Sequence, residues 1–404
     1  MNEIYKTIKI NPIEPKSAKW IHSVIPAICL HCSIGSVYAF SLFVKPISEA
    51  LNKSTQSVQF AFSLAIFFLG MSAAFGGSLV EKNIKRSTLV STICFCVGLI
   101  IAGIALHIKS LVLLYIGYGI VMGIGLGIGY LSPVKTLMLW FKDNKGLATG
   151  ISVCAFGFAS TIASPIITYL TTHYSLTISF IALACIYFVP MLIAHFLLRK
   201  PLNWHEPLTQ SDFKISILLK DRKFRYIWLM IYINIACGLA LISTASAVCN
   251  EIKFDLKTTA LIVSIMGIFN GAGRLVLSAI SDKFKNRSNM YLIVFIMSTI
   301  VTLISWFIPK FSIITLMGIS AGYGAGFSLL PSLLSDIYGM KNISKIHGTI
   351  LSAWAVAGVT GNQFAELVHS SSNSYLTILP ILCCAYSLMI IVKILLDKEI
   401  NNSK

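Results

Sequence analysis

The 404-residue chain has little charge, since only 12% of its residues are Asp, Glu, Lys or Arg, whereas 56% are hydrophobic. A soluble globular domain carries about 25% charged residues, so this composition excludes an ordinary soluble protein. Proline and glycine are also few, at 12 and 27 residues, which excludes a collagen-like or low-complexity disordered chain. The composition therefore predicts a chain whose surface lies largely in a lipid bilayer.

The sequence also lacks a cysteine pattern. Its ten cysteines fall almost entirely within apolar segments, and their spacing resembles neither a disulfide framework nor a zinc site. We interpret them as small buried hydrophobic residues. No cluster of His, Asp and Glu converges within the apolar segments, so we expect no metal, no cofactor and no enzyme active site.

Long apolar runs recur along the whole chain, and about 20 such residues cross the hydrocarbon core of a bilayer. They predict an all-α membrane protein with twelve transmembrane helices. The expected spans are residues 20–44, 57–80, 88–106, 110–139, 147–170, 176–198, 226–249, 258–281, 290–308, 311–335, 347–369 and 374–396.

Positive charge is divided unevenly between the loops. If the N-terminus is cytoplasmic, the inner segments contain 24 lysines and arginines and the outer loops contain six, as the positive-inside rule requires. We therefore expect both termini in the cytoplasm and, without an organelle-targeting segment, a plasma (cell inner) membrane. The same rule accounts for the net charge of +17 without a nucleic-acid partner. The other two cations, Lys135 and Arg274, lie within predicted spans.

The two halves of the sequence match weakly at a shift of about 200 residues. Glu81 after the second span corresponds to Asp282 after the eighth, and Lys145 at the fifth span corresponds to His347 at the eleventh. Glycine rows before a proline recur in the fourth and tenth spans, at 123, 125, 127 and 129 before Pro133 and at 318, 322, 324 and 326 before Pro331. Such rows permit either sliding or static close packing of helices.

These correspondences predict two pseudo-symmetric six-helix halves, 20–198 and 226–396, joined by a cytoplasmic linker over 199–225. The terminal segments 1–19 and 397–404 are expected to be cytoplasmic. Two such halves rocking about a central site form the major facilitator pattern.

Three motifs carry a resemblance to a known family. Residues 140–150 read WFKDNKGLATG and follow Gly129-Tyr130, residues 270–274 read NGAGR, and residues 331–339 read PSLLSDIYG. In this order they resemble the oxalate:formate antiporter family of the major facilitator superfamily, which is related to the monocarboxylate transporters. The resemblance implies a carrier of small organic anions.

The resemblance also implies a substrate site. Arg274 matches the family's cationic substrate residue, and its planar guanidinium suits bidentate binding of a carboxylate. An arginine inside a span costs at least about 2.5–3.5 kcal/mol on insertion, so we expect it to serve a function. The family's cavity-lining aromatic residues match Tyr38, Tyr130 and Tyr323.

Two positions depart from the family pattern. Trp354 stands where oxalate-exchanging members have a lysine on helix 11, which removes a second substrate cation. Asn270 stands where monocarboxylate transporters have an aspartate one turn before the arginine, which removes the usual proton-coupling partner.

Several other polar residues in or near the spans have two interpretations each. Lys135 either snorkels to the cytoplasmic surface or supplies a second cation to the anion site. For His31, a neutral imidazole hydrogen-bonded within the bundle is preferred to a proton carrier. For Glu366, solvation near the outer helix end is preferred to proton coupling.

Three acids lie at cytoplasmic helix ends beside basic loops: Glu81, Asp282 and Asp336. We expect them to form latches between the two halves that hold one conformation closed. Ordinary surface pairing is the alternative.

We expect a monomeric carrier, embedded in the bilayer, for monocarboxylates such as lactate, pyruvate or formate, working by anion exchange or by proton coupling. A dicarboxylate exchanger of the oxalate/formate kind is the second hypothesis. A membrane sensor is less favoured because no soluble signalling domain is attached.

Overall fold

The computed structural model describes residues 14–15, 17–204 and 214–402, and the regular elements in these ranges are helical. In chain order, the first half contains η1 (Trp20–Val24), α1 (Ile25–Ile34), η2 (Gly35–Ala39), α2 (Ser41–Leu51), α3 (Thr55–Lys82), α4 (Ile84–His107), α5 (Leu111–Leu114), η3 (Tyr115–Met122), α6 (Gly123–Trp140), α7 (Lys145–His173) and α8 (Leu176–Leu197). After the short α9 (Ile215–Lys220), the second half contains α10 (Arg222–Glu251), α11 (Leu256–Ser281), α12 (Ser288–Phe307), η4 (Pro309–Phe311), α13 (Ser312–Tyr338), α14 (Ile343–Ile350), α15 (Ser352–Ser372) and α16 (Ile378–Asn401).

Eleven of the described helical segments are long and apolar enough to cross a membrane. The 21-residue α15 occupies the place of the eleventh predicted span and completes a twelve-helix bundle. The predicted fold class is therefore confirmed, and several helices extend beyond the expected spans. The first span continues through α2 to Leu51, and α16 continues to Asn401, because a helix can extend into water where its residues are polar. Glu399 in that extension pairs with Arg222 at 3.4 Å.

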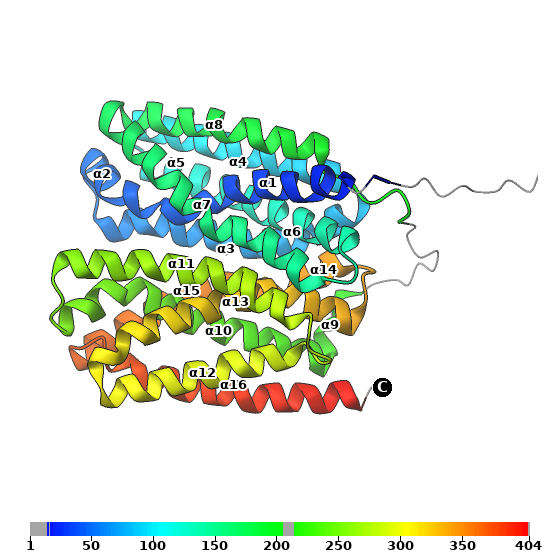
Figure 1. The fold of residues 1–404 in the computed structure, drawn as a ribbon. Helices are drawn as coiled ribbons and strands as arrows, with labels where there is room; N and C mark the ends of the chain where they lie inside the picture. The colour runs from blue at the N-terminus through cyan, green and yellow to red at the C-terminus, as the bar shows by residue number, and fades with distance from the viewer. Residues whose placement is uncertain (1–13, 16, 205–213, 403–404) are drawn as a thin grey trace, which may run out of the picture.

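The helices form two groups that lie side by side (Figure 1). Helices α1–α8 lie on one side of the view and α10–α16 on the other, and α9 and the C-terminus lie at the same end of the bundle. We call this end, which carries the connection between α8 and α10, the linker end. The other end carries the α2–α3 and α10–α11 connections and is called the opposite end.

Polar side chains cap the start of several long helices. Ser54, Asn83 and Ser175 each accept a hydrogen bond from the backbone N–H three residues further on, at the beginning of α3, α4 and α8. Such caps satisfy donors that the first helical turn leaves unpaired. The polar loops of the sequence therefore determine where these apolar helices begin.

The glycine rows lie at close helix contacts in both halves. A methyl group on Gly127 of α6 would come within 2.0 Å of the Leu69 carbonyl oxygen on α3. In the second half, one on Gly324 of α13 would come within 2.2 Å of the Asn270 carbonyl oxygen on α11. These equivalent contacts support the close-packing interpretation of the rows.

The surface and the cysteines agree with a membrane bundle. Large apolar side chains such as Phe75, Phe307 and Leu367 are exposed on the outside of the helices, where lipid would cover them. All ten cysteines are free, as their spacing predicts.

Candidate functional site

Arg274 lies on α11, about two turns from the linker end of that helix, and is 1% exposed. Its Nε donates to Asn270 Oδ1 at 2.9 Å, and a terminal nitrogen donates to the Val153 carbonyl of α7 at 3.2 Å. The guanidinium carbon lies 5.9 Å and 5.4 Å from the ring centres of Phe156 and Phe327. Within the described part of the chain no carboxylate forms an ion pair with it. The site therefore holds a fixed positive charge that has no counter-ion among the described side chains.

Four aromatic side chains from η2, α6, α13 and α15 gather around this charge. Trp354 packs on Phe327 with ring centres 4.4 Å apart and on Tyr130 with ring centres 5.8 Å apart. Tyr38 packs edge-on against Phe156 at 5.4 Å. We call Arg274 and these four aromatic residues the central cluster: Arg274, Tyr38, Tyr130, Tyr323 and Trp354.

The polar atoms of the four aromatic residues make no hydrogen bond of standard geometry. The hydroxyls of the three tyrosines and the indole N–H of Trp354 are buried and lack such a bond among the described residues, although the Tyr38 hydroxyl is close enough to interact with the Tyr323 hydroxyl and with the Arg274 guanidinium. The tyrosines also lie within electrostatic range of Arg274. Buried polar groups are nearly always paired, and an unpaired one costs about 1–3 kcal/mol. Four such groups beside one buried cation indicate a site for a ligand that has acceptor atoms.

A carboxylate suits this arrangement. Its two oxygens accept hydrogen bonds from the guanidinium fork, from phenol hydroxyls and from an indole N–H. One cation balances one negative charge, while the aromatic faces accommodate a short apolar tail. Six residues that the sequence assigns to a substrate site are thus brought together: Tyr38, Tyr130, Asn270, Arg274, Tyr323 and Trp354.

Lys135, the seventh predicted site residue, has a different environment. It is 3% exposed, and its ammonium is bound to the carboxylate of Glu81 on α3. The expectation that Lys135 snorkels to the surface is therefore corrected, and the charge that the other expectation assigned to the anion site is balanced by Glu81. A buried ammonium needs such a partner because desolvating an unpaired charge is costly.

His31 is fully buried on α1 beside the central cluster. Its Nδ1 lies 2.5 Å from the Ser152 carbonyl oxygen and its Nε2 lies 3.1 Å from the Tyr130 carbonyl oxygen. The ring also stacks on Tyr130 with centres 5.2 Å apart. These contacts hold His31 within the bundle and position Tyr130. A neutral ring can donate to only one of the two carbonyl oxygens, so the contacts do not distinguish the preferred neutral imidazole from a proton carrier.

His347 on α14 is a candidate that charge and motif patterns do not single out. It is 2% exposed, and its Nε2 has no hydrogen-bond partner in the described part of the chain. Its ring centre lies 5.9 Å from that of Tyr130. Its alignment with Lys145 in the repeat is the only sequence signal that could have pointed to it.

The Glu366 side chain lies outside the described residues, so its predicted roles remain predictions. Among the residues that are described, no group of three metal-binding side chains occurs.

Glu81, at the end of α3, joins the two halves at the linker end. One carboxylate oxygen accepts the backbone N–H of Ser344 at the start of α14 at 2.6 Å, and the other binds Lys135. Helix N-termini favour such contacts because their first N–H groups lack intrahelical partners and carry partial positive charge. We call Glu81, Lys135 and Ser344 the first latch.

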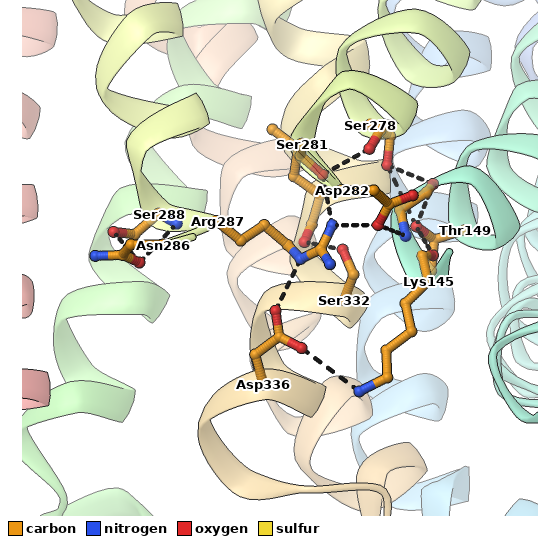
Figure 2. A network of polar contacts seen from close by, with 12 residues as sticks. Lys145, Thr149, Ser278, Ser281, Asp282, Asn286, Arg287, Ser288, Ser332 and Asp336 are labelled. Atoms are coloured by element: carbon orange, nitrogen blue, oxygen red, sulfur yellow. Dashed lines mark hydrogen bonds and ion pairs between the residues drawn. The ribbon is translucent and has the colours of Figure 1, made fainter. Parts of the chain in front are cut away.

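Asp282, directly after α11, makes the equivalent contact in the other direction (Figure 2). Its two oxygens accept the backbone N–H groups of Gly146 at 2.8 Å and Leu147 at 2.9 Å, at the start of α7. Arg287 donates to the same carboxylate at 2.8 Å. The aspartate therefore attaches the second half to the first through a helix N-terminus.

Asp336, at the end of α13, extends this network toward solvent (Figure 2). It accepts from Arg287 Nε at 2.8 Å and lies 3.5 Å from the ammonium of Lys145 on α7. The Asp336 side chain is 39% exposed, whereas that of Arg287 is 10% exposed. We call Asp282, Arg287, Asp336 and Lys145 the second latch.

Close packing between the halves continues inward from the first latch. A methyl group on Gly77 of α3 would come within 2.4 Å of the Ser344 carbonyl oxygen, and one on Gly348 of α14 would come within 2.0 Å of the Ala73 carbonyl oxygen. The linker end is therefore closed along α3 and α14.

Comparisons with known proteins match the chain to one superfamily. A sequence profile of the family described as Major Facilitator Superfamily matches residues 27–362. The oxalate:formate antiporter of Oxalobacter formigenes is 25% identical over 360 residues, which cover 87% of this chain and 85% of that protein. Monocarboxylate transporter 12 of Xenopus laevis is 23% identical over 310 residues, which cover 69% of this chain and 66% of that protein.

Among solved structures, a bacterial homologue of the iron transporter ferroportin in an outward-facing state has a TM-score of 0.75 to this chain. It is 10% identical, and the match covers 93% of this chain and 98% of that one. This likeness concerns the fold.

Proposed function

Because the chain belongs to the Major Facilitator Superfamily, we propose that it carries small organic anions by alternating access, with monocarboxylates such as lactate, pyruvate or formate preferred. The observation that carries this proposal is Arg274, a buried cation without a carboxylate partner among the described residues. Four unpaired polar atoms around it would bind the carboxylate oxygens. Members of this superfamily bind substrate near the bilayer midplane between two halves.

One fixed cation favours one carboxylate. A dianion brought into a buried site leaves its hydration shell, and its second charge needs a second cation. Trp354 offers an N–H donor but no charge, and the Lys135 ammonium is already bound to Glu81. Both observations favour monocarboxylates over dicarboxylates.

The alternative is a dicarboxylate exchanger of the oxalate/formate kind. It is supported by the 25% identity to the oxalate:formate antiporter over most of both chains. In that case a dicarboxylate would bind with one carboxylate on Arg274 and the other on the uncharged donors of the central cluster.

We further propose that the linker end faces the cytoplasm of a cell inner membrane, with both termini inside. The bias of 24 to six cations supports this orientation. The closed linker end then corresponds to an outward-facing state, in which Glu81, Asp282 and Asp336 act as gating residues. Flux is driven by a counter-anion or by a proton, with His31 and Glu366 as the candidate proton carriers, in a monomeric carrier.

Uptake into proteoliposomes tests this proposal. Protein reconstituted alone, in vesicles preloaded with unlabelled lactate or under an imposed proton gradient, should take up labelled lactate or pyruvate above the level of protein-free vesicles, and unlabelled monocarboxylates should compete better than oxalate. Arg274→Gln should abolish uptake, whereas Arg222→Gln, which removes an exposed arginine at the linker end, should not. Stronger competition by oxalate would establish the alternative, and no uptake of any carboxylate would reject both.

A further inference from the structure

One buried polar group lies between the central cluster and the first latch and belongs to neither. His347 is 2% exposed, and its Nε2 has no partner within the described chain. It is a neighbour of Tyr130, at 5.9 Å between ring centres, and Tyr130 is in turn a neighbour of Trp354 at 5.8 Å. Three unpaired polar atoms from α6, α14 and α15 therefore belong to neighbouring side chains, which form one wall with His347 nearest to the linker end.

The position of His347 on α14 explains when this wall would be used. Ser344, one turn before it, is held by Glu81, and Gly348, the next residue, is pressed against the Ala73 carbonyl of α3. The contacts that close the linker end thus flank His347 on both sides. Opening that end requires α14 to leave α3, which would expose His347 to the path between Arg274 and the linker end.

An imidazole suits a carboxylate on this path. A neutral histidine donates one N–H, and a hydrogen bond to a charged acceptor is stronger than one between neutral groups. Of the other charged groups near α14, Glu81 and Lys135 are bound to each other, and Lys345 lies on α14 itself. Like the polar atoms of Tyr130 and Trp354, His347 Nε2 can therefore form a new hydrogen bond without breaking an ion pair.

We propose that His347, with Tyr130 and Trp354, forms a second carboxylate-binding station that is used when the linker end is open. This inference rests on the proposed function, because it assumes that a carboxylate passes Arg274. The substrate is held by Arg274 while the linker end is closed, and His347 donates to its carboxylate on the way to or from that end.

Equilibrium binding of labelled lactate to the purified full-length protein tests this station in two backgrounds. The first is the unchanged protein, with the linker end closed. The second carries Glu81→Gln and Asp282→Asn, which remove the latch carboxylates and should open that end. His347→Phe keeps an aromatic ring without a donor and should weaken binding about tenfold in the open background, the size of one charge-assisted hydrogen bond. In the closed background it should change affinity less than about twofold.

The matched control is His369→Phe, since His369 lies in α15 near the opposite end and stacks on Tyr375. It should leave binding unaltered in both backgrounds. A loss of equal size for His347→Phe in both backgrounds, or no loss in either, would overturn the station. If neither parent binds any carboxylate, the proposed function itself fails, which is a different result.

Chemical modification of the native histidine avoids dependence on the folding of a variant. Diethyl pyrocarbonate should modify His347 in the open background and not in the closed one, as read by mass spectrometry of the peptide. Saturating lactate should protect it. Modification in the open background without protection by lactate would contradict the inference.

Discussion

In both latches at the linker end, a carboxylate of one half binds a helix N-terminus of the other half, but the two latches differ in their ion pairs. In the first, Glu81 binds one backbone N–H of the eight-residue α14 and an ammonium that is 3% exposed. In the second, Asp282 binds two backbone N–H groups of the 29-residue α7 and shares Arg287 with Asp336, which is 39% exposed. The first latch has one ion pair, whereas the second has a pair that is similarly buried, with Asp282 and Arg287 each 10% exposed, and in which Arg287 also binds the solvent-exposed Asp336.

This difference has a consequence for how the carrier opens. Removing one member of a buried ion pair leaves the other charge desolvated and without a partner. This destabilises the protein more than replacing both members by apolar residues would. In a shared network, Arg287 keeps one carboxylate when the other is lost, and solvent screens the exposed member. The first latch should therefore control the closed state more strongly than the second.

The largest effect is expected for Glu81→Gln, because Lys135 then loses the carboxylate that binds its buried ammonium. The closed state should lose about 3–5 kcal/mol. Labelling of Cys154, which lies on α7 within electrostatic range of Arg274, by an impermeant thiol reagent from the linker side should rise strongly. Adding Lys135→Met should recover thermal stability. Unchanged labelling would show that the first latch does not hold the closed state.

Lys135→Gln should have the next largest effect. It should weaken the first latch and leave the affinity for the anion nearly unchanged. Glu81 keeps the Ser344 N–H and is 14% exposed, so we expect a loss of about 1–3 kcal/mol in folding stability. Lactate affinity should stay within about twofold, whereas a cation that faces the anion would change it by about tenfold or more. Calorimetric melting measures the loss of folding stability, and a binding isotherm measures the lactate affinity. A tenfold weaker affinity would show that Lys135 belongs to the substrate site.

A smaller effect is expected for Asp282→Asn. The asparagine oxygen still accepts one N–H of α7, and Arg287 keeps its ion pair with Asp336. We therefore expect the closed state to lose about 1–2 kcal/mol of stability. Cys154 labelling should rise less than in Glu81→Gln. The opposite ranking of the two variants would mean that the second latch is the dominant one.

The smallest effect is expected for Lys145→Gln. Its ammonium lies 3.5 Å from Asp336 and both side chains are partly exposed, at 23% and 39%. Such pairs contribute roughly 0–1 kcal/mol and weaken with salt. Thermal unfolding midpoints of Lys145→Gln and the parent should differ slightly at low salt and coincide at high salt. A large difference that persists in salt would contradict this ranking.

Much of the fold is predictable because lipid imposes a simple rule, that about 20 apolar residues make one span. The rule fails at ends, where α16 continues beyond its apolar stretch to Asn401. It also misses the interruption between α14 and α15 at Leu351, since hydropathy reports what is apolar and not where a helix breaks.

The central residues of the site are predictable for a different reason. Arg274 is a cation within an apolar span, which is costly and therefore conspicuous. The partner of Lys135 is not predictable, because Glu81 is 54 positions away on another helix and the rotation of α3 against α6 decides whether they meet. His347 does not stand out from the charge pattern, and only the structure shows that its Nε2 is buried without a hydrogen-bond partner among the described residues.

Lactate binding by the purified protein tests most directly the claim that Arg274 and its unpaired neighbours form a carboxylate site. We predict saturable binding to the unchanged chain, none to Arg274→Gln with an unchanged melting temperature, and weakened binding to Arg274→Lys, because an ammonium keeps the charge without the bidentate fork. Equal lactate binding by the unchanged chain and a folded Arg274→Gln would contradict the account.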